Sequence, residues 1–202
     1  MPPFPGAAGA GAQDPGRLDR DRSVLLVIDI QQRLAPSVRD HAAVIARSEA
    51  LLAAARRFRI PCLVTEHCAD RIGPVVPQLR ERFDAAEIFA KTRFAATDHP
   101  EFGTLLRAQG RPQVVVAGME AHVCVLQTVL GIVAEGFGVY VAGDAVGSRG
   151  ARALDRTLAL ERMRSAGCTV AGTETMLFEW ARAGDDVAFR DVLALVKRLP
   201  ED

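Results

Sequence analysis

The chain has no long apolar run, no excess charge of either sign and very little lysine. No apolar stretch reaches the length of about 18 residues that a membrane-spanning helix needs, so no membrane partner is expected. Because 25 basic residues balance 25 acidic residues, a nucleic acid is not expected as the main partner. Only Lys91 and Lys197 are lysines, so a lysine beside an apolar strand is an informative choice.

Paired cysteines and a signal peptide are also missing. The four cysteines follow no regular spacing, which favours reduced thiols in a cytoplasmic protein. The first residues are rich in Pro, Gly and Ala but lack the charged segment and apolar core of a signal peptide. We therefore expect a disordered tail over residues 1–22 and one domain over residues 23–202.

Apolar runs alternate with helical patterns along the domain, which predicts strands and helices in alternation. Strands are expected at 23–29, 61–66, 86–90, 113–117, 139–142 and 168–171. Helices are expected at 41–59, 101–109, 123–135, 151–166, 173–183 and 187–198, with a proline-rich loop containing one helical turn between 72 and 83. This order is typical of an α/β fold with three layers, α/β/α, and a mostly parallel, Rossmann-like sheet of roughly six strands.

Three residues that can carry chemistry follow three different strands. Asp29 ends the first strand, Lys91 follows the third, and Cys124 stands where the fourth strand gives way to a helix. In parallel α/β sheets ligands bind beyond the carboxyl ends of the strands, so one rim can hold all three. A helix N-terminus lowers the pKa of a cysteine and can hold an oxyanion, which makes Cys124 a candidate nucleophile.

Each of these residues also has an ordinary structural interpretation. Asp29 can cap a turn, Lys91 can reach solvent from a strand end, and Cys124 can be an inert core thiol. We expect that last state for Cys62 and Cys168, which lie in apolar strands. The joint placement at three strand ends, together with the motifs described next, favours the catalytic interpretation.

Four motifs carry a resemblance that covers the chain from residue 23 onward. They are Val-Ile-Asp-Ile-Gln at 27–31, Lys-Thr-Arg-Phe at 91–94, Gly-Met-Glu-Ala-His-Val-Cys-Val-Leu-Gln-Thr at 118–128 and Asp-Ala-Val-Gly-Ser-Arg at 144–149. Together they resemble the isochorismatase-like cysteine hydrolases, a family that includes nicotinamidases and N-carbamoylsarcosine amidases. The Glu-Ala-His before the cysteine and the Gly-Pro-x-Val-Pro loop at 73–77 are similar to a branch of small proteins whose substrate is unassigned.

The resemblance implies a hydrolase that cleaves a non-peptide C–N bond of a small amide-like substrate through a thioester. Asp29 would take the thiol proton, Cys124 would attack the carbonyl, and Lys91 would orient the pair and stabilise charge. The family pattern also implies a cis peptide bond between Met119 and Glu120, and an oxyanion hole made by the N–H groups of Glu120 and Cys124. It implies no cofactor and a homo-oligomer, either a dimer or a larger assembly.

Other positions shape the expected pocket. We expect Phe94 to form an apolar wall, Gln31 to support the site by hydrogen bonding, and His122 to line the pocket or satisfy its turn. A metal is not expected at His67, which we interpret as a loop histidine because no second histidine follows nearby. Nicotinamidases hold their substrate through a metal, so that activity is not expected either.

Alternative functions remain at this point. One is a catalytically idle binding or scaffold module. A second is an oligomer whose main role is assembly, in which the apolar faces of the last two helices pack on a neighbouring subunit. We expect those faces to cover the sheet within one subunit instead. Another is the ether cleavage of true isochorismatases, which lack the nucleophilic cysteine, so Cys124 argues against it.

Overall fold

The computed structural model describes residues 16–201 and contains one six-stranded sheet in which all strands are parallel. The spatial order is β3-β2-β1-β4-β5-β6. The strands are β1 Ser23–Ile28, β2 Cys62–His67, β3 Ile88–Lys91, β4 Gln113–Met119, β5 Gly138–Gly147 and β6 Thr169–Ala171. The predicted three-layer α/β fold is confirmed.

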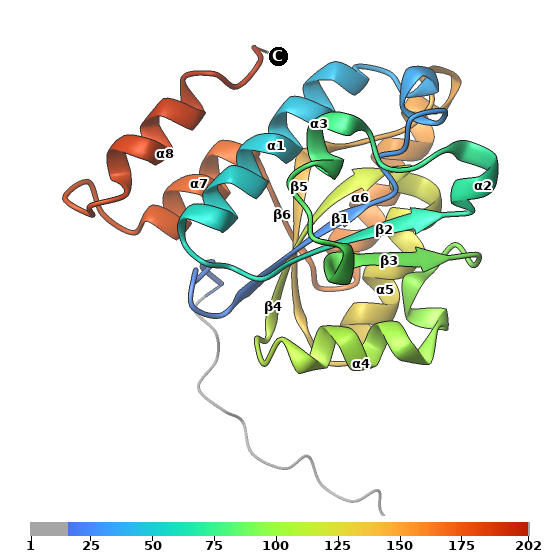
Figure 1. The fold of residues 1–202 in the computed structure, drawn as a ribbon, viewed down its shortest axis with the longest axis horizontal. Helices are drawn as coiled ribbons and strands as arrows, with labels where there is room; N and C mark the ends of the chain where they lie inside the picture. Colours follow the sequence, from blue (N-terminus) through green and yellow to red (C-terminus); the bar gives the residue numbers. More distant parts are fainter. Residues whose placement is uncertain (1–15, 202) are drawn as a thin grey trace, which may run out of the picture.

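Helices cover both faces of the sheet (Figure 1). They are α1 His41–Arg57, α2 Ala69–Ile72, α3 Pro77–Arg80, α4 Pro100–Ala108, α5 Leu126–Ala134, α6 Ala153–Ser165, α7 Thr173–Ala181 and α8 Phe189–Val196. Short 3-10 turns lie at η1 Ala35–Ser37, η2 Ala85–Glu87, η3 Ala96–Asp98 and η5 Gly150–Arg152, and a π-helix, η4, spans Ala121–Val125. Helices α1, α3, α7 and α8 share one core with the sheet, and α4, α5 and α6 share the other.

Strand β1 shows why the sequence folds in this way. All six of its residues are buried, and the five apolar ones alternate between the two cores. Leu25 and Val27 face the α1 side, whereas Val24 and Leu26 face the α5 side. A parallel sheet that is covered on both faces needs such a continuous apolar run.

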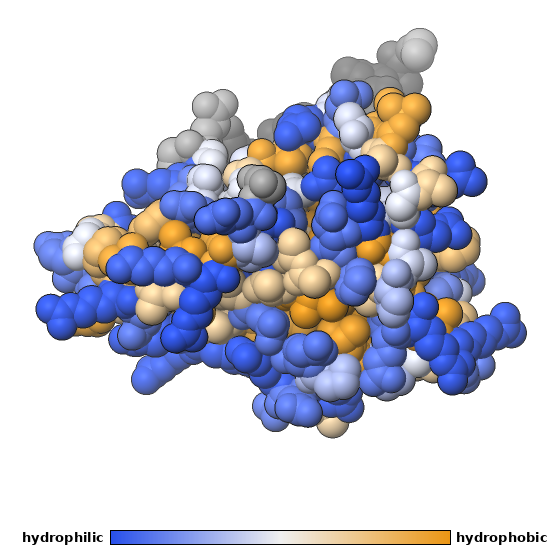
Figure 2. Space-filling view, turned by 90° about the horizontal axis from the view of Figure 1, so that it is seen from above, coloured by the Kyte–Doolittle hydropathy of each residue, from blue (hydrophilic) through white to orange (hydrophobic). Residues whose placement is uncertain are grey.

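The last two helices belong to the core of the same subunit. Leu177, Trp180 and Val192 are buried in the core that α1 shares with the sheet, and Phe178, Leu195 and Val196 pack against it while partly exposed. These side chains therefore cover the sheet, as expected. The face in Figure 2 is mostly hydrophilic, with apolar residues showing in separate patches. Across residues 16–201 no helix combines the length and apolarity needed to span a bilayer.

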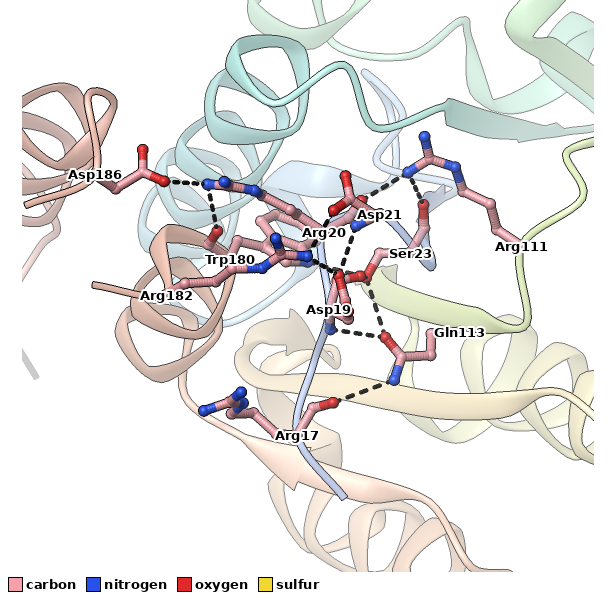
Figure 3. A network of polar contacts seen from close by, with 10 residues as sticks. All are labelled: Arg17, Asp19, Arg20, Asp21, Ser23, Arg111, Gln113, Trp180, Arg182 and Asp186. Carbon is pink, nitrogen blue, oxygen red and sulfur yellow. Dashed lines mark hydrogen bonds and ion pairs between the residues drawn. The ribbon is translucent and has the colours of Figure 1, made fainter. Parts of the chain in front are cut away.

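The segment just before β1 is held to the domain by polar contacts (Figure 3). Leu18 is only 1% exposed, and its N–H donates to Glu179. Asp19 accepts a bond from Arg182 and donates its N–H to Gln113 at 2.8 Å. Within the predicted tail, Leu18 and Asp19 therefore contact the domain. The remainder of the predicted tail, residues 1–15, lies outside the described residues.

Two element boundaries differ from the prediction in ways that matter for the site. Strand β5 continues beyond the expected range of 139–142 to Gly147, after an irregularity in its register opposite Val116 and Gly118. The helix expected at 123–135 begins with the π-helix η4 at Ala121 and continues as α5. Both changes affect the chain that surrounds Cys124.

Candidate active site

The three candidate catalytic residues leave the sheet at its C-terminal edge. Asp29 follows β1, Lys91 is the last residue of β3, and Cys124 lies in η4 just after β4. Between β1 and β4 the order of the strands reverses, since β2 and β3 extend the sheet on one side and β5 and β6 on the other. Such a switch point is where α/β sheets bind ligands.

Gly118 brings the ends of β1 and β4 into close contact. It pairs with Ile28 across the sheet and has a φ of 149°. A Cβ atom at this position would lie 2.3 Å from the carbonyl oxygen of Ile28, so no other residue fits without movement of the backbone. This contact places Asp29 next to the turn that carries Cys124.

Asp29 and Lys91 form a buried ion pair. Lys91 Nζ lies 2.6 Å from Asp29 Oδ2, and both side chains are 0% exposed. The same Nζ donates to the carbonyl oxygens of Arg93 at 3.3 Å and Phe94 at 3.0 Å. A buried pair is kept only when its remaining hydrogen bonds are satisfied, and these carbonyl groups meet that need.

Thr65 holds the other oxygen of Asp29, a contact that the sequence interpretation missed. Its Oγ1 donates to Asp29 Oδ1 at 2.6 Å. The pairing of Ile28 with Thr65 in adjacent parallel strands explains why this hydroxyl reaches the carboxylate. Asp29 itself has a φ of 50°, an uncommon conformation for a residue other than glycine and one that recurs at functional sites.

Cys124 is 6% exposed and lies in the π-helix, a type of helix found often at functional sites. Burial, and after it the negative charge of Asp29, raise the pKa of its thiol, the positive charge of Lys91 lowers it, and the resulting pKa is about 12. The hydrogen bond of the thiol with Asp29 also raises its pKa, and the hydrogen bond with Lys91 also lowers it. The lowered pKa expected from a helix N-terminus is therefore wrong, and the thiol is protonated near neutral pH.

The other buried cysteines have raised pKa values for a simpler reason. Burial raises the pKa of Cys62 to about 12 and that of Cys168 to about 11. Neither Asp29 nor Lys91 acts on the pKa of either thiol. They fit the interpretation as core thiols.

The turn before Cys124 is braced from β5. The peptide bond between Met119 and Glu120 is cis, as the resemblance implied. Glu120 Oε1 accepts hydrogen bonds from the N–H of Arg149 at 3.1 Å and from its Nε at 2.8 Å. His122 Nδ1 lies 2.9 Å from the hydroxyl of Ser148. The chain at 148–149 therefore holds the nucleophile turn at two points.

The expected pocket residues lie in different surroundings. Gln31 is buried, and its Nε2 donates to the carbonyl oxygens of His67 and Gly73. Its Oε1 accepts a hydrogen bond from the N–H of His67. Phe94 is 51% exposed, and its ring centroid lies 5.3 Å from that of His67. Gln31 thus supports the chain around the site, while Phe94 stands at its solvent side.

His67 is the last residue of β2 rather than a loop histidine, which corrects the expectation. Burial lowers its pKa, the charge of Lys91 lowers it further, and the charge of Asp29 raises it, so the imidazole lies near the ion pair. Its Nδ1 atom is shielded from solvent and has no hydrogen-bond partner in the described part of the chain. Within residues 16–201 no group of three or more His, Cys, Asp or Glu side chains is arranged to hold a metal ion.

Comparisons with known proteins bear on the family and the fold. Residues 23–175 match the family model described as the isochorismatase domain. The isochorismatase domain-containing protein 2 of Danio rerio is 31% identical over 182 residues, a match that covers 90% of this chain and 90% of the relative.

Solved structures with the same fold are also similar in sequence. The MAR1 ribonuclease of Caenorhabditis elegans is 33% identical, with a TM-score of 0.83 over 92% of this chain and 95% of that one. YcaC of Pseudomonas aeruginosa, solved with covalent acrylamide, is 30% identical, with a TM-score of 0.83 over 91% of this chain and 93% of that one. YcaC of Escherichia coli, described as an octameric hydrolase of unknown specificity, is 29% identical, with a TM-score of 0.81 over 93% and 91%.

Proposed function

This chain belongs to the isochorismatase family, whose members are hydrolases, and we propose that it cleaves a non-peptide C–N bond in a small amide-like substrate. The observation that carries this proposal is the buried trio of a thiol, a carboxylate and an ammonium group. An acid that contacts both other groups can accept a proton from the thiol and return it to a leaving amine.

In the first half of the reaction, Asp29 takes the thiol proton while the sulfur of Cys124 attacks the carbonyl carbon. The tetrahedral intermediate collapses, the C–N bond breaks, and the proton held on Asp29 passes to the departing nitrogen. A thioester on Cys124 remains. Asp29 then removes a proton from a water molecule that attacks the thioester, and the thiol and an acid product are released.

A protonated resting thiol suits this sequence of steps. With a pKa of about 12, the thiol of Cys124 carries little charge before substrate arrives. The base must then act during the attack, and Asp29 is fixed for this by Thr65 on one oxygen and Lys91 on the other. Lys91 balances the negative charge as it moves between the carboxylate and the sulfur.

We assign the oxyanion hole to the backbone N–H groups of Glu120 and Cys124. The bonds from Arg149 to the Glu120 side chain support this assignment because they hold the turn that presents these groups. One such donor contributes about 3 kcal/mol to transition-state stabilisation in comparable enzymes.

For the substrate pocket, we assign Phe94 and His67 to the wall on the solvent side of the ion pair. Their rings are in contact at 5.3 Å, and the lowered pKa of His67 keeps the imidazole neutral at neutral pH. Such a wall suits a small uncharged amide. Gln31 and His122 act by holding the surrounding chain, through His67 and Ser148.

RNA cleavage is a second candidate activity, because the chain is similar to the MAR1 ribonuclease. The balanced charge of the chain and a thiol that is 6% exposed favour a small substrate over a polynucleotide.

The octameric neighbour supports a homo-oligomer. We also propose a cytoplasmic location, because the cysteines suit a reducing compartment.

The proposal is tested by an ammonia-release screen over small amides, ureides and carboxamides of nitrogen heterocycles. The wild-type protein is compared with Cys124→Ala and with Cys168→Ala, a matched control because both cysteines are 6% exposed. We expect at least one compound to release ammonia with the wild type and the control but not with Cys124→Ala. Release that persists unchanged in Cys124→Ala would refute the role of this thiol.

A further inference from the structure

We propose that a cavity beside the C-terminal end of β5 is a second binding site, which takes a small anion bearing a carboxylate or phosphate group. The cavity has a volume of about 520 Å³, a size found for small-molecule sites. Its walls come from the start of α1, the end of β5 and the first turns of α6. None of Asp29, Lys91 and Cys124 lines it, so it is separate from the catalytic trio.

Two partly or wholly buried arginines line the cavity. The side chain of Arg47 is 9% exposed, and its Nε lies 3.3 Å from Asp144 Oδ2. Arg156 donates from Nε to the carbonyl oxygen of Val146 at 2.9 Å and from Nη2 to that of Gly143. Burial lowers the pKa of Arg156, the charges of Asp144 and Asp40 raise it, and the charge of Arg47 lowers it, so this guanidinium group lies among charges of both signs.

Donors for such an anion come from Arg156 and Arg39. Among the described residues, the Nη1 group of Arg156 makes no hydrogen bond, since its two bonds use Nε and Nη2. Arg39 is 67% exposed, and its Nε lies 3.5 Å from Asp40 Oδ2. An exposed pair of this kind contributes little, so the Arg39 side chain can turn to a ligand at small cost.

Asp144, the least exposed carboxylate of the cavity, is already paired. Asp144 Oδ1 accepts two hydrogen bonds from Thr173 at 2.8 Å, and Oδ2 faces Arg47. Asp40 and Glu201 also line the cavity, and both are exposed, as Arg39 is. The N-terminal turns of α1 and α6 add a partial positive charge, because Ala43 and Ala153 are among the lining residues.

One wall of the cavity is also the brace of the nucleophile turn. Ser148 lines the cavity, its carbonyl oxygen accepts the N–H of Arg39 at 3.1 Å, and its hydroxyl lies 2.9 Å from His122 Nδ1. The next residue, Arg149, holds Glu120. An anion that contacts Arg39 therefore acts on the chain that positions Cys124, so the site is an effector site as well as a binding site.

Binding is tested on the full chain by isothermal titration calorimetry with inorganic phosphate and with succinate. Arg39→Ala is compared with a matched control, Arg71→Ala. Arg71 is also an exposed arginine next to an aspartate, with its Nε 3.9 Å from Asp70 Oδ2. We expect saturable binding of one probe, weakened about tenfold in Arg39→Ala and unchanged in the control. The tighter probe identifies the anionic group. No saturable binding of either probe, or equal weakening in both variants, would overturn the proposal.

Coupling is read from the rate at which methyl methanethiosulfonate modifies Cys124, followed by peptide mass spectrometry. We expect saturating anion to change this rate by about fivefold or more in the wild type. In Ser148→Ala, which lacks the bond to His122, the anion should still bind but leave the rate nearly constant. An unchanged wild-type rate, with binding established, would refute the effector role.

Discussion

Replacing Asp29 with asparagine should make the Cys124 thiol more reactive while it abolishes turnover. In the wild-type protein the pKa of this thiol is about 12, and the charge of Asp29 is one cause. Asparagine keeps the shape of the side chain and an oxygen that can accept the bond from Thr65, but it removes the negative charge. Lys91 would then stand beside the sulfur without its acidic partner.

The size of the effect follows from the burial of the three groups. Two unit charges about 4 Å apart interact by about 4 kcal/mol at an effective dielectric constant of about 20. One pKa unit corresponds to about 1.4 kcal/mol, so the pKa of Cys124 should fall by about three. The thiolate fraction then rises about a thousandfold, and the lower nucleophilicity of a more acidic thiol reduces the net gain in rate to about fiftyfold.

The assay is the rate of modification by methyl methanethiosulfonate at a fixed mildly alkaline pH, with peptide mass spectrometry to separate the cysteines. Cys62 and Cys168 are internal controls, because neither Asp29 nor Lys91 acts on their pKa values. The double variant Asp29→Asn, Lys91→Met lacks both charges, so its Cys124 should react more slowly than that of Asp29→Asn alone. A Cys124 rate in Asp29→Asn equal to or below that of the wild type would refute the electrostatic reasoning.

Three further predictions concern stability, which urea unfolding or the Tm measures. Gly118→Ala should lower the free energy of unfolding by about 3 kcal/mol or more, because its Cβ would lie 2.3 Å from a backbone oxygen of the neighbouring strand. The control Gly184→Ala, whose Cβ meets no atom within 4 Å, should change it by no more than about 0.5 kcal/mol. Similar losses of stability in the two variants would contradict the packing argument. Trp180→Phe removes the 3.0 Å bond from the indole N–H to Ser23 and should cost about 1–2 kcal/mol, and an unchanged midpoint would count against that bond. Burial lowers the pKa of His67 below its unfolded value of 6.5, so the unfolded state binds the proton first and stability falls as the pH drops below that value. His67→Gln should therefore show a shallower loss of Tm between about pH 7 and pH 5, and an unchanged slope would show that other groups cause it.

The fold and the meeting of the three site residues were predictable because parallel strands leave a strong trace in the sequence. The run at 24–28 is apolar at every position, since both faces of β1 are covered. Once the runs are placed in a parallel sheet, Asp29, Lys91 and Cys124 must leave it at the same edge. That step needs only the order of elements and no side-chain detail.

Other features depend on contacts between distant positions, and no local pattern reports them. Thr65 reaches Asp29 only through the pairing of β1 with β2, and Leu18 is a single apolar residue in a polar segment without periodicity. The predicted direction of the Cys124 pKa shift was wrong, because burial and the charge of Asp29 outweigh the effect of a helix N-terminus. The pairing of Arg47 with Asp144 joins positions 97 residues apart.

The central claim is that Cys124 forms a covalent bond with the substrate during turnover. The most direct measurement is acid quenching of the wild-type protein during hydrolysis of an active amide, followed by peptide mass spectrometry. The account predicts an acyl group on the peptide that contains Cys124, removable by hydroxylamine and missing in Cys124→Ala. Rapid turnover without any such adduct, together with full activity of Cys124→Ala, would contradict it.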